Sequence, residues 1–375
     1  MRVVKPAELA EAEAEAWREL RAKSGAPANP FMEPEFTLAV GRVRPGARVA
    51  VIRERGDGSG PGEPIGFFPY ERGPLGQGRA IGLGVSDCQG GIFRTGSGPG
   101  AVAGTGAAMP LTVRELLRGC SLATWEFDNL EAGQRLFGPA EAFTGFESPV
   151  IEVGEGYEAY AAGVRTRSPK FFRTTTAKER RLARQAGEVR FVFDERDPAA
   201  LRTLMAWKSA QYRRTGRSDR FAKEWISALV RDLATTRAPG CSGVLSVLYV
   251  ADRPVAAHFG LRSRTLLSCW FPAYDPEFAK FSPGLILHLR MAEAAAGAGI
   301  GVLDLGRGAA EYKDALKTGG LRVHEGTATR PGVRSALHHL SKEPVRRAHG
   351  FVRERPRLAA YTRTALTTWG RLRSR

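Results

Sequence analysis

The alternation of apolar and polar residues predicts mostly strands in the first half of the chain, after an N-terminal helix from about Pro6 to Lys23. The segment "NPFMEPEF" from Asn29 to Phe36 places two prolines around aromatic residues and is expected to dock the chain onto the first domain. The pattern then predicts two strands joined by a glycine-rich turn, a third strand with a glycine-rich turn, a helix and a further strand, at Ala47 to Arg55, Pro64 to Arg72, Gly78 to Phe93, Leu111 to Gly119 and Leu122 to Leu130.

The second half repeats this order of elements. A three-stranded meander, a helix with proline at a tolerated first-turn position, and another strand are predicted at Ser242 to Val250, Val255 to Arg262, Leu266 to Asp275, Ser282 to Gly299 and Gly301 to Gly306. The halves therefore read as two copies of one mixed α/β unit, joined near Ser148 to Gly156. We expect domains at 1–150 and 151–330, followed by a tail at 331–375.

Composition indicates a globular protein rather than a disordered one. The chain has 375 residues, of which 43% are hydrophobic and 25% charged, and this length favours two domains. The N-terminus has no apolar core of a secretion signal, and no run of about 18 apolar residues occurs. The four cysteines lack metal-site spacing. The cytoplasm is the expected compartment, and no metal is expected.

Positive charge is concentrated in the tail. Residues 330–375 contain twelve Lys and Arg against two acids, which gives ten of the seventeen net positive charges. Apolar residues recur there at steps of three or four, from Leu358 to Leu372, and predict a basic amphipathic helix. Such a helix could hold tRNA, lie on an anionic membrane, or pack onto the second domain with incidental charge.

The order of strands and helices resembles the Gcn5-related N-acetyltransferase (GNAT) fold. In duplicated form the chain resembles the Fem-type aminoacyl transferases and the CelD-like acetyltransferases, over about Asn29 to Gly326. The resemblance rests on separated pieces in a preserved order, namely "NPFMEPEF", "SDCQGG", "SPKFFRTTTAKERRL", "WKSAQYRRTG", "RPVAAHFGLR", "WFPAYDPEFAKFSPGLIL" and "LDLGRGAAEYK". It implies acyl transfer to an amine, with the acceptor in the first domain and the donor and catalytic cleft in the second.

The corner after the last strand, "LDLGRGAAEYK", carries the candidate catalytic residues. A tyrosine hydroxyl such as that of Tyr312 can return a proton to a leaving group, and a lysine ammonium can stabilise an oxyanion. The resemblance implies this second role for Lys313, expected as an exposed charge directed at the cleft. The alternative is a plain helix start with Glu311 near the helix dipole and Lys313 in solvent.

The donor side is expected at the start of the helix that follows the meander. Ser282 and Gly284 lie in "FSPG", where ordinary GNAT enzymes carry a loop with more glycines that cradles the coenzyme A pyrophosphate. This departure favours aminoacyl-tRNA as the donor and leaves acyl-CoA as the alternative. Lys170, which opens a basic segment with Phe171 and Phe172, and Gln211 and Tyr212 of "WKSAQYRRTG", read as a helix start, are further candidate donor-binding residues. The basic segment also fits a solvated amphipathic helix.

The acceptor side is expected to involve Asp87 in the glycine-rich turn, which could also be a simple turn former. Trp270 and Tyr274 at the end of the central strand are expected to wall a substrate channel. Arg307 is predicted to pair with Asp304 across the corner, or else to face the substrate.

Two other residues, Cys88 and His258, are of types that can act in catalysis. Cys88 has no evident His or Asn partner in the sequence, so covalent catalysis is disfavoured. His258 lies within an apolar strand, which favours a core histidine over a base.

Three functions remain open at this point. The first is a Fem-like aminoacyl transferase that uses aminoacyl-tRNA, without a tightly bound cofactor, to acylate an amine of a small molecule or cell-wall-type acceptor. The second is a coenzyme A-dependent N-acetyltransferase of the CelD-like kind. The third is a non-catalytic GNAT-fold protein that binds an anionic partner through the tail. The sequence specifies neither the acyl group nor the acceptor.

Overall fold

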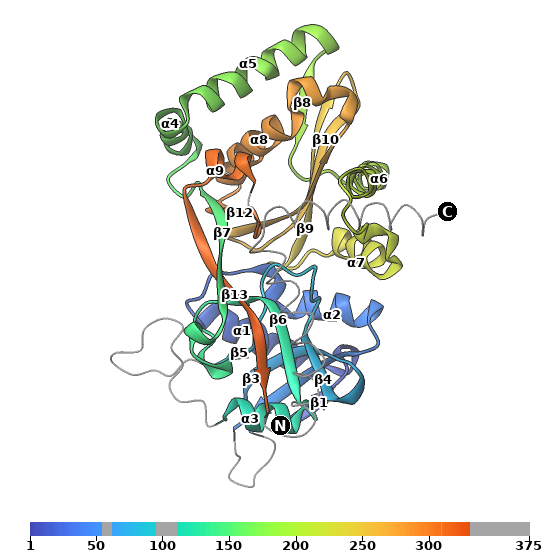
Figure 1. The fold of residues 1–375 in the computed structure, drawn as a ribbon, viewed down its shortest axis with the longest axis vertical. Coiled ribbons are helices and arrows are strands. Elements are labelled where there is room, and N and C mark those ends of the chain that lie inside the picture. The colour runs from blue at the N-terminus through green and yellow to red at the C-terminus, as the bar shows by residue number, and fades with distance from the viewer. Residues whose placement is uncertain (55–61, 95–110, 309, 331–375) are drawn as a thin grey trace, which may run out of the picture.

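The computed structural model describes residues 1–54, 62–94, 111–308 and 310–330, and these form a mixed α/β fold around one large sheet (Figure 1). Neighbouring strands follow the order β1-β2-β3-β4-β6-β13-β7-β12-β11-β10-β9-β8, and β5 pairs with β3. Elements of the first half of the chain lie at one end of this sheet, and elements of the second half lie at the other. The predicted tail lies outside the described residues.

The first half builds an antiparallel meander that ends in a parallel pair. Its strands are β1 (Arg2–Val4), β2 (Ala47–Arg53), β3 (Pro64–Arg72), β4 (Gln77–Ala80) and the short β5 (Ile92–Phe93). After α3 (Val113–Gly119), strand β6 (Thr124–Glu131) returns parallel to β4. The predicted strands and helix are confirmed, although the predicted segment from Gly78 to Phe93 contains two short strands rather than one.

The second half repeats this arrangement. An antiparallel meander of β8 (Val189–Val192), β9 (Ser242–Val250), β10 (Arg253–Arg262) and β11 (Leu266–Tyr274) is followed by α8 (Pro283–Gly297). Strand β12 (Val302–Asp304) then lies parallel to β11. The predicted repeat of meander, helix and parallel strand is therefore present in both halves.

The two halves exchange their last strands. Strand β7 (Thr144–Glu152) belongs to the first half in sequence, yet it pairs with β12 of the second half. Strand β13 (Gly319–Thr329) follows β12 in sequence and pairs with β6 of the first half, while β7 and β13 pair with each other. The segment expected to join the halves, Ser148 to Gly156, contains the end of the central strand β7 and the residues directly after it. The division at residues 150 and 151 stays a prediction.

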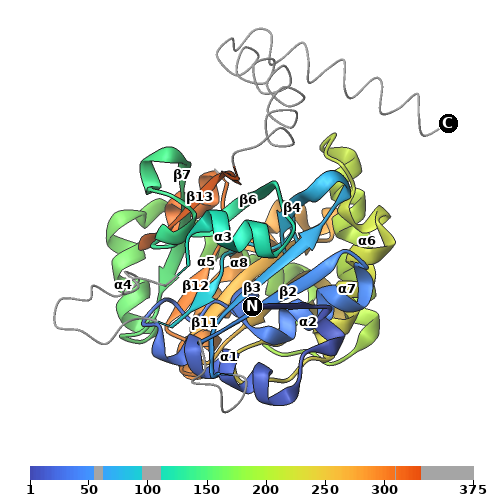
Figure 2. The ribbon, with the colours of Figure 1, turned by 90° about the horizontal axis from the view of Figure 1, so that it is seen from below.

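Helices cover the faces of the sheet, as the view in Figure 2 shows. Besides α3 and α8, they are α1 (Glu11–Lys23), α2 (Pro34–Val43), α4 (Tyr157–Arg167), α5 (Pro169–Ala186), α6 (Pro198–Arg214), α7 (Glu224–Thr235) and α9 (Glu311–Leu316). The predicted N-terminal helix is divided into a 3-10 turn (Pro6–Glu8) and α1. The segment "WKSAQYRRTG" lies in the second half of α6 rather than at a helix start. Among the described residues, no helix is both long and apolar enough to cross a membrane.

The segment "NPFMEPEF" joins the two halves instead of docking onto the first alone. The Trp17 indole N–H donates to the Met32 carbonyl at 2.9 Å, which holds this segment to α1. The rings of Phe31 and Phe36 contact Trp270 of β11, with centroids 5.2 and 6.4 Å apart. These aromatic contacts bury Trp270 in the core shared by the two halves.

Candidate active site

A cavity of about 440 Å³ opens where β11 and β12 stop pairing. The last paired residues are Ser268 and Asp304. Beyond them β11 continues to Tyr274, while the segment after β12 turns toward α9. Seven of the eleven predicted site residues line this cavity, namely Gln211, Tyr274, Ser282, Gly284, Arg307, Tyr312 and Lys313. The residues predicted from α6, β11, α8 and α9 therefore meet at one place in the structure.

Lys313 is a buried cation in the cavity wall. It is 8% exposed, and its Nζ donates to the Gly306 carbonyl at 2.7 Å. Burial lowers the Lys313 pKa, and the nearby carboxylates of Asp87 and Asp304 act in the opposite direction. The expectations of an exposed charge and of a solvated lysine were both wrong. The single carbonyl partner leaves other N–H groups of the ammonium for a ligand.

Asp304 and Arg307 do not pair with each other. The Asp304 carboxylate accepts from the Ser148 hydroxyl at 2.5 Å and from the Gly306 N–H at 3.0 Å. The Arg307 guanidinium instead donates to the Asp128 carbonyl and to the Glu325 carboxylate, and it lies over the Phe146 ring. The predicted ion pair was wrong because the exchanged strands β7 and β13 provide closer partners for both groups.

Asp87 reaches this corner from the first half of the chain. A Cβ placed on Gly306 would lie 3.4 Å from Asp87 Oδ2, so the carboxylate sits against the turn whose carbonyl holds Lys313. Burial, followed by the neighbouring Asp304, raises the Asp87 pKa to about 7, while Arg220 and Lys313 oppose the rise. A carboxylate with this pKa can accept and release a proton near neutral pH.

Tyr312 packs beside His288 with ring centroids 5.4 Å apart. Burial, with a smaller effect from Cys269, raises the Tyr312 pKa to about 12. The hydroxyl therefore stays protonated at neutral pH and is available as a hydrogen-bond donor. His288 is held by a 2.6 Å hydrogen bond between Nδ1 and the Gly284 carbonyl, which fixes its ring against the cavity.

The start of α8 offers few free amides to a phosphate. Ser282 has a left-handed backbone (φ 52°), and its hydroxyl accepts from Lys178 Nζ of α5 at 2.7 Å. Pro283 has no N–H, and the Leu285 N–H donates to the Ser282 carbonyl at 2.9 Å. The reduced glycine content seen in the sequence thus corresponds to a reduced anion cradle.

Lys208 is a cavity residue that the sequence reasoning missed. Its Nζ donates to the Pro272 carbonyl at 2.8 Å. Burial, followed by the charges of Arg217 and Arg220, lowers the Lys208 pKa to about 8. The signal was present, because Lys208 lies three residues before Gln211 on the same face of α6.

Three predicted residues lie away from the cavity. Trp270 is buried, and its indole N–H donates to the Val85 carbonyl at 2.6 Å, so it does not wall the channel. Tyr212 lies under Lys208, with the ammonium 5.3 Å from the ring centroid. Lys170 is exposed near the start of α5.

The buried Cys88 and His258 lack the features of a nucleophile and base. Burial raises the Cys88 pKa well above its usual value, which keeps the thiol protonated. Burial also lowers the His258 pKa well below its usual value, and Nε2 accepts the Trp270 backbone N–H at 3.1 Å. Within the described residues, no cluster of three or more His, Cys, Asp or Glu side chains is arranged to hold a metal ion.

Comparison with known proteins finds a family match for a segment in the second half of the chain. Residues 170–314 match the model of an acetyltransferase (GNAT) domain. No curated protein matches the chain. The structure of FemX aligns over 91% of this chain and 99% of its own, with a TM-score of 0.59 and 10% identity.

Two further structures show similar coverage. A conserved protein of unknown function from Bacteroides thetaiotaomicron covers 84% of this chain and 97% of its own, with a TM-score of 0.51 and 10% identity. L-PGS from Bacillus licheniformis covers 88% and 96%, with a TM-score of 0.49 and 12% identity. The chain thus contains a GNAT domain, and as a whole it shares the fold of FemX.

Proposed function

We propose that this chain, which carries a GNAT domain in its second half, is an acyltransferase that moves an aminoacyl group from aminoacyl-tRNA to the amine of a small molecule or cell-wall-type acceptor. The observation that carries the proposal is the cavity at the end of β11, which a buried ammonium and a protonated phenol line, together with a carboxylate from the other half that lies against the neighbouring Gly306 turn. These are the groups that amide formation from an ester requires.

Lys313 stabilises the oxyanion in this mechanism. The acceptor amine attacks the carbonyl carbon of the aminoacyl ester, a C–N bond forms, and negative charge develops on the carbonyl oxygen. Lys313 is already fixed by the Gly306 carbonyl, so its ammonium needs no reorientation when that charge appears. Its burial strengthens the interaction, because less water screens the charge.

Asp87 and Tyr312 move the protons. Asp87 accepts a proton from the acceptor ammonium, which frees the lone pair that attacks. When the intermediate collapses, the C–O bond to the terminal ribose breaks, and the Tyr312 hydroxyl gives its proton to the leaving oxygen. The second amine proton then restores Tyr312. The Asp87 pKa of about 7 suits the first step, and the Tyr312 pKa of about 12 suits the second.

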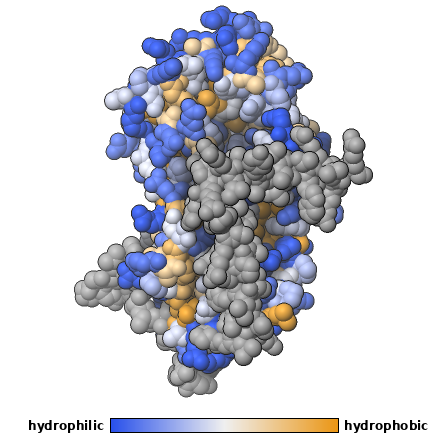
Figure 3. Space-filling view, viewed as in Figure 1, coloured by the Kyte–Doolittle hydropathy of each residue, from blue (hydrophilic) through white to orange (hydrophobic). Residues whose placement is uncertain are grey.

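A row of cations on α5 supports an RNA donor. Lys170, Arg173, Arg180 and Arg184 are exposed, and none forms an ion pair within the described residues. At 3.6 residues per turn they fall within about 80° of arc and span about 21 Å of the helix. Figure 3 shows hydrophilic residues gathered at this end of the molecule. Such a row fits successive phosphates of a nucleic acid backbone.

The same helix is attached to the donor side of the cavity. Lys178 donates to the Ser282 hydroxyl, and the Arg181 guanidinium donates to the Lys280 carbonyl at 3.0 Å. These contacts fix α5 to the chain just before α8. A polyanion bound along α5 would therefore lie on an element that is connected to the cavity. The acyl end of this polyanion has to reach that cavity.

Acyl transfer from acetyl-CoA is the second candidate, and the observation in its favour is that the matching domain model describes an acetyltransferase. The few free amides at the start of α8 weigh against it. The test is deacylation of tRNA charged with labelled amino acids, with and without a panel of primary amines. Amine-dependent loss of the ester supports aminoacyl transfer. Amine-dependent thiol release from acetyl-CoA, with stable aminoacyl-tRNA, supports the second candidate.

A further inference from the structure

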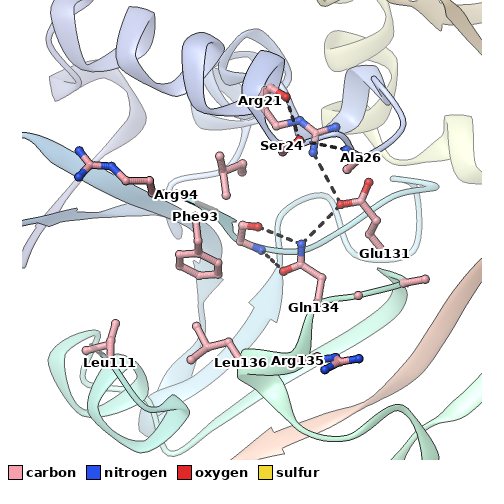
Figure 4. Close-up of a pocket in the computed structure, with 14 residues that line it drawn as sticks. Arg21, Ser24, Ala26, Phe93, Arg94, Leu111, Glu131, Gln134, Arg135 and Leu136 are labelled. Carbon is pink, nitrogen blue, oxygen red and sulfur yellow. Dashed lines mark hydrogen bonds and ion pairs between the residues drawn. The ribbon is translucent and has the colours of Figure 1, made fainter. Parts of the chain in front are cut away.

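A second cavity of about 260 Å³ lies in the first half of the chain (Figure 4). Its walls come from the end of α1, from β5 and from the segment that follows β6. It shares no lining residue with the cavity around Lys313. The mechanism proposed above does not use it.

A buried ion pair with unfilled hydrogen-bonding capacity lines this cavity. Arg21 is 7% exposed and Glu131 is 8% exposed. Arg21 Nη1 lies 3.6 Å from Glu131 Oε2, and Arg21 Nε lies 3.7 Å from Oε1 of the buried Glu33, so both carboxylates are beyond hydrogen-bond distance. Arg21 Nε and Glu131 Oε1 have no hydrogen-bond partner in the described residues. Buried polar atoms are rarely left in this state, because each costs free energy until a partner arrives.

The floor beside this pair is rigid. Gln134 Nε2 donates to the Gly91 carbonyl, and the Gly91 N–H donates to Gln134 Oε1, both at 3.0 Å. A Cβ on Gly90 would lie 2.7 Å from the Gln134 amide carbon, so the glycine is required for this close approach. The motif that supplies Asp87 therefore also contributes Gly91 to the lining of this cavity.

The remaining walls are largely apolar, with two further arginines, Arg94 and Arg135. Ile92, Phe93 and Leu136 line the cavity together with Arg135, which is exposed. This combination of a buried charged pair with an apolar wall suits a small ligand that has polar groups at one end and a hydrocarbon part at the other.

A smaller cavity of about 90 Å³ lies between this cavity and the Lys313 corner. It shares the lining residues Glu131 and Ala132 with the first, and Asp87 and Asp304 also line it. A ligand held at Glu131 is thus separated from the proposed chemistry by this small space.

We propose that the cavity binds an amino-acid-type ligand, with its carboxylate on Arg21, its ammonium on Glu131 and its hydrocarbon part against Phe93 and Leu136. A ligand with both charges fills the capacity of both partners, whereas a singly charged ligand leaves one buried group unsatisfied. The identification of this ligand as the acceptor, or part of it, rests on the proposed function. Its binding does not.

The test compares three probes that share a hydrocarbon chain: L-norleucine, hexylamine and hexanoate. Their binding to the full chain is measured by saturation-transfer NMR without any acyl donor, so its outcome is independent of transfer activity. We expect norleucine to bind at least about tenfold more tightly than either singly charged probe. Equal binding of all three, or no binding of norleucine, would overturn the proposal.

One charge variant and one matched pair of variants locate the binding. Glu131→Gln keeps the shape and removes the charge, so norleucine affinity should fall about tenfold while hexanoate affinity should not fall. Ala26→Trp places a bulky ring at the lining residue Ala26 and should abolish norleucine binding, whereas Ala12→Trp, on the exposed face of α1, should not. Unchanged norleucine affinity in both Glu131→Gln and Ala26→Trp would show that norleucine binds elsewhere and would overturn the proposal.

Discussion

Each half contains a parallel strand pair, and the two halves place different chemical groups after the last strand of that pair. After β12 the chain turns through Gly306 and returns Lys313 to that turn, in a cavity whose charged lining residues are Lys208, Arg217, Arg307 and Lys313. After β6 the chain instead carries Glu131, which faces the buried Arg21. The charged residues described around the second-half cavity are thus all cations, whereas the first-half cavity places the Glu131 carboxylate among three arginines, namely Arg21, Arg94 and Arg135. The repeated unit supplies the frame, and the segment after its last parallel strand determines what each half can bind.

Replacing Lys313 should have the largest effect on activity. In Lys313→Ala the oxyanion loses its charged partner. The activation free energy should therefore rise by about 2 to 4 kcal/mol, which lowers kcat roughly 30- to 1000-fold. The measurement is single-turnover transfer with saturating donor. The control is Lys317→Ala, which removes a half-buried lysine just after the same short helix. Turnover that is unchanged in a folded Lys313→Ala protein would refute the assignment.

Removing the α5 row should weaken donor binding rather than chemistry. With Lys170, Arg173, Arg180 and Arg184 changed to alanine, up to four phosphate contacts are lost, so the slope of log affinity against log salt should become shallower by up to about 3.6. Salt titrations of tRNA affinity measure this.

The charge-matched control changes four exposed arginines elsewhere, Arg114, Arg118, Arg202 and Arg214. If both quadruple variants have the same slope, α5 is not the site of RNA contact. Transfer from a minimal aminoacylated oligonucleotide should be nearly unaffected by the α5 changes.

Asp87→Asn should alter the pH dependence of the reaction. If Asp87 accepts the amine proton, kcat/KM for the acceptor should rise as pH passes about 7, and this rise should be absent in the variant. A rise that persists unchanged in Asp87→Asn would exclude this role.

Asp87 should also lower the stability of the folded protein once it is ionised. Because folding raises the Asp87 pKa from 3.8 to about 7, the folded state holds the proton more tightly, and ionisation above this window costs stability. Asp87→Asn should therefore have a higher Tm than the parent at pH 8 and nearly the same Tm at pH 4. A lower Tm at pH 8 would contradict the raised pKa.

The smallest effect is expected from the turn between β12 and α9. Gly306 and Gly308 both have positive φ angles, 75° and 117°, so alanine strains either position by about 1 kcal/mol. Only at Gly306 would the new methyl group approach Asp87, since nothing lies within 4 Å of a Cβ on Gly308. Gly306→Ala should reduce transfer about tenfold more than Gly308→Ala, as measured by kcat/KM. Equal losses would mean that only backbone strain matters.

Local patterns predicted most strands because each carries its own periodicity. The segments that became β2, β3, β9, β10 and β11, and the helix α8, were located nearly to the residue. The cavity was also anticipated in outline, since the corner motif and the start of α8 are both short-range features. Local patterns failed where the partner is distant. The exchange of β7 and β13 cannot be read from either segment alone, because pairing is decided by the rest of the sheet.

Burial explains the errors at individual site residues. Trp270 was placed in a channel because it ends a strand, yet Phe31 and Phe36 from the other half cover it. Lys313 was expected as an exposed charge directed at the cleft because it lies near a helix start, yet it is buried and donates to the Gly306 carbonyl, with Asp87 against the same turn. In each case the deciding contact comes from the opposite half of the chain or across a tight turn, where sequence spacing carries no information.

The most direct test of the central claim offers both donors at once. The full chain is incubated with tRNA charged with a labelled amino acid, with differently labelled acetyl-CoA and with a panel of primary amines, and mass spectrometry identifies the acyl group on the product. The account predicts aminoacylated amine that disappears in Lys313→Ala and remains in Lys317→Ala. Exclusively acetylated amine, or an aminoacylated product that persists in Lys313→Ala, would contradict it.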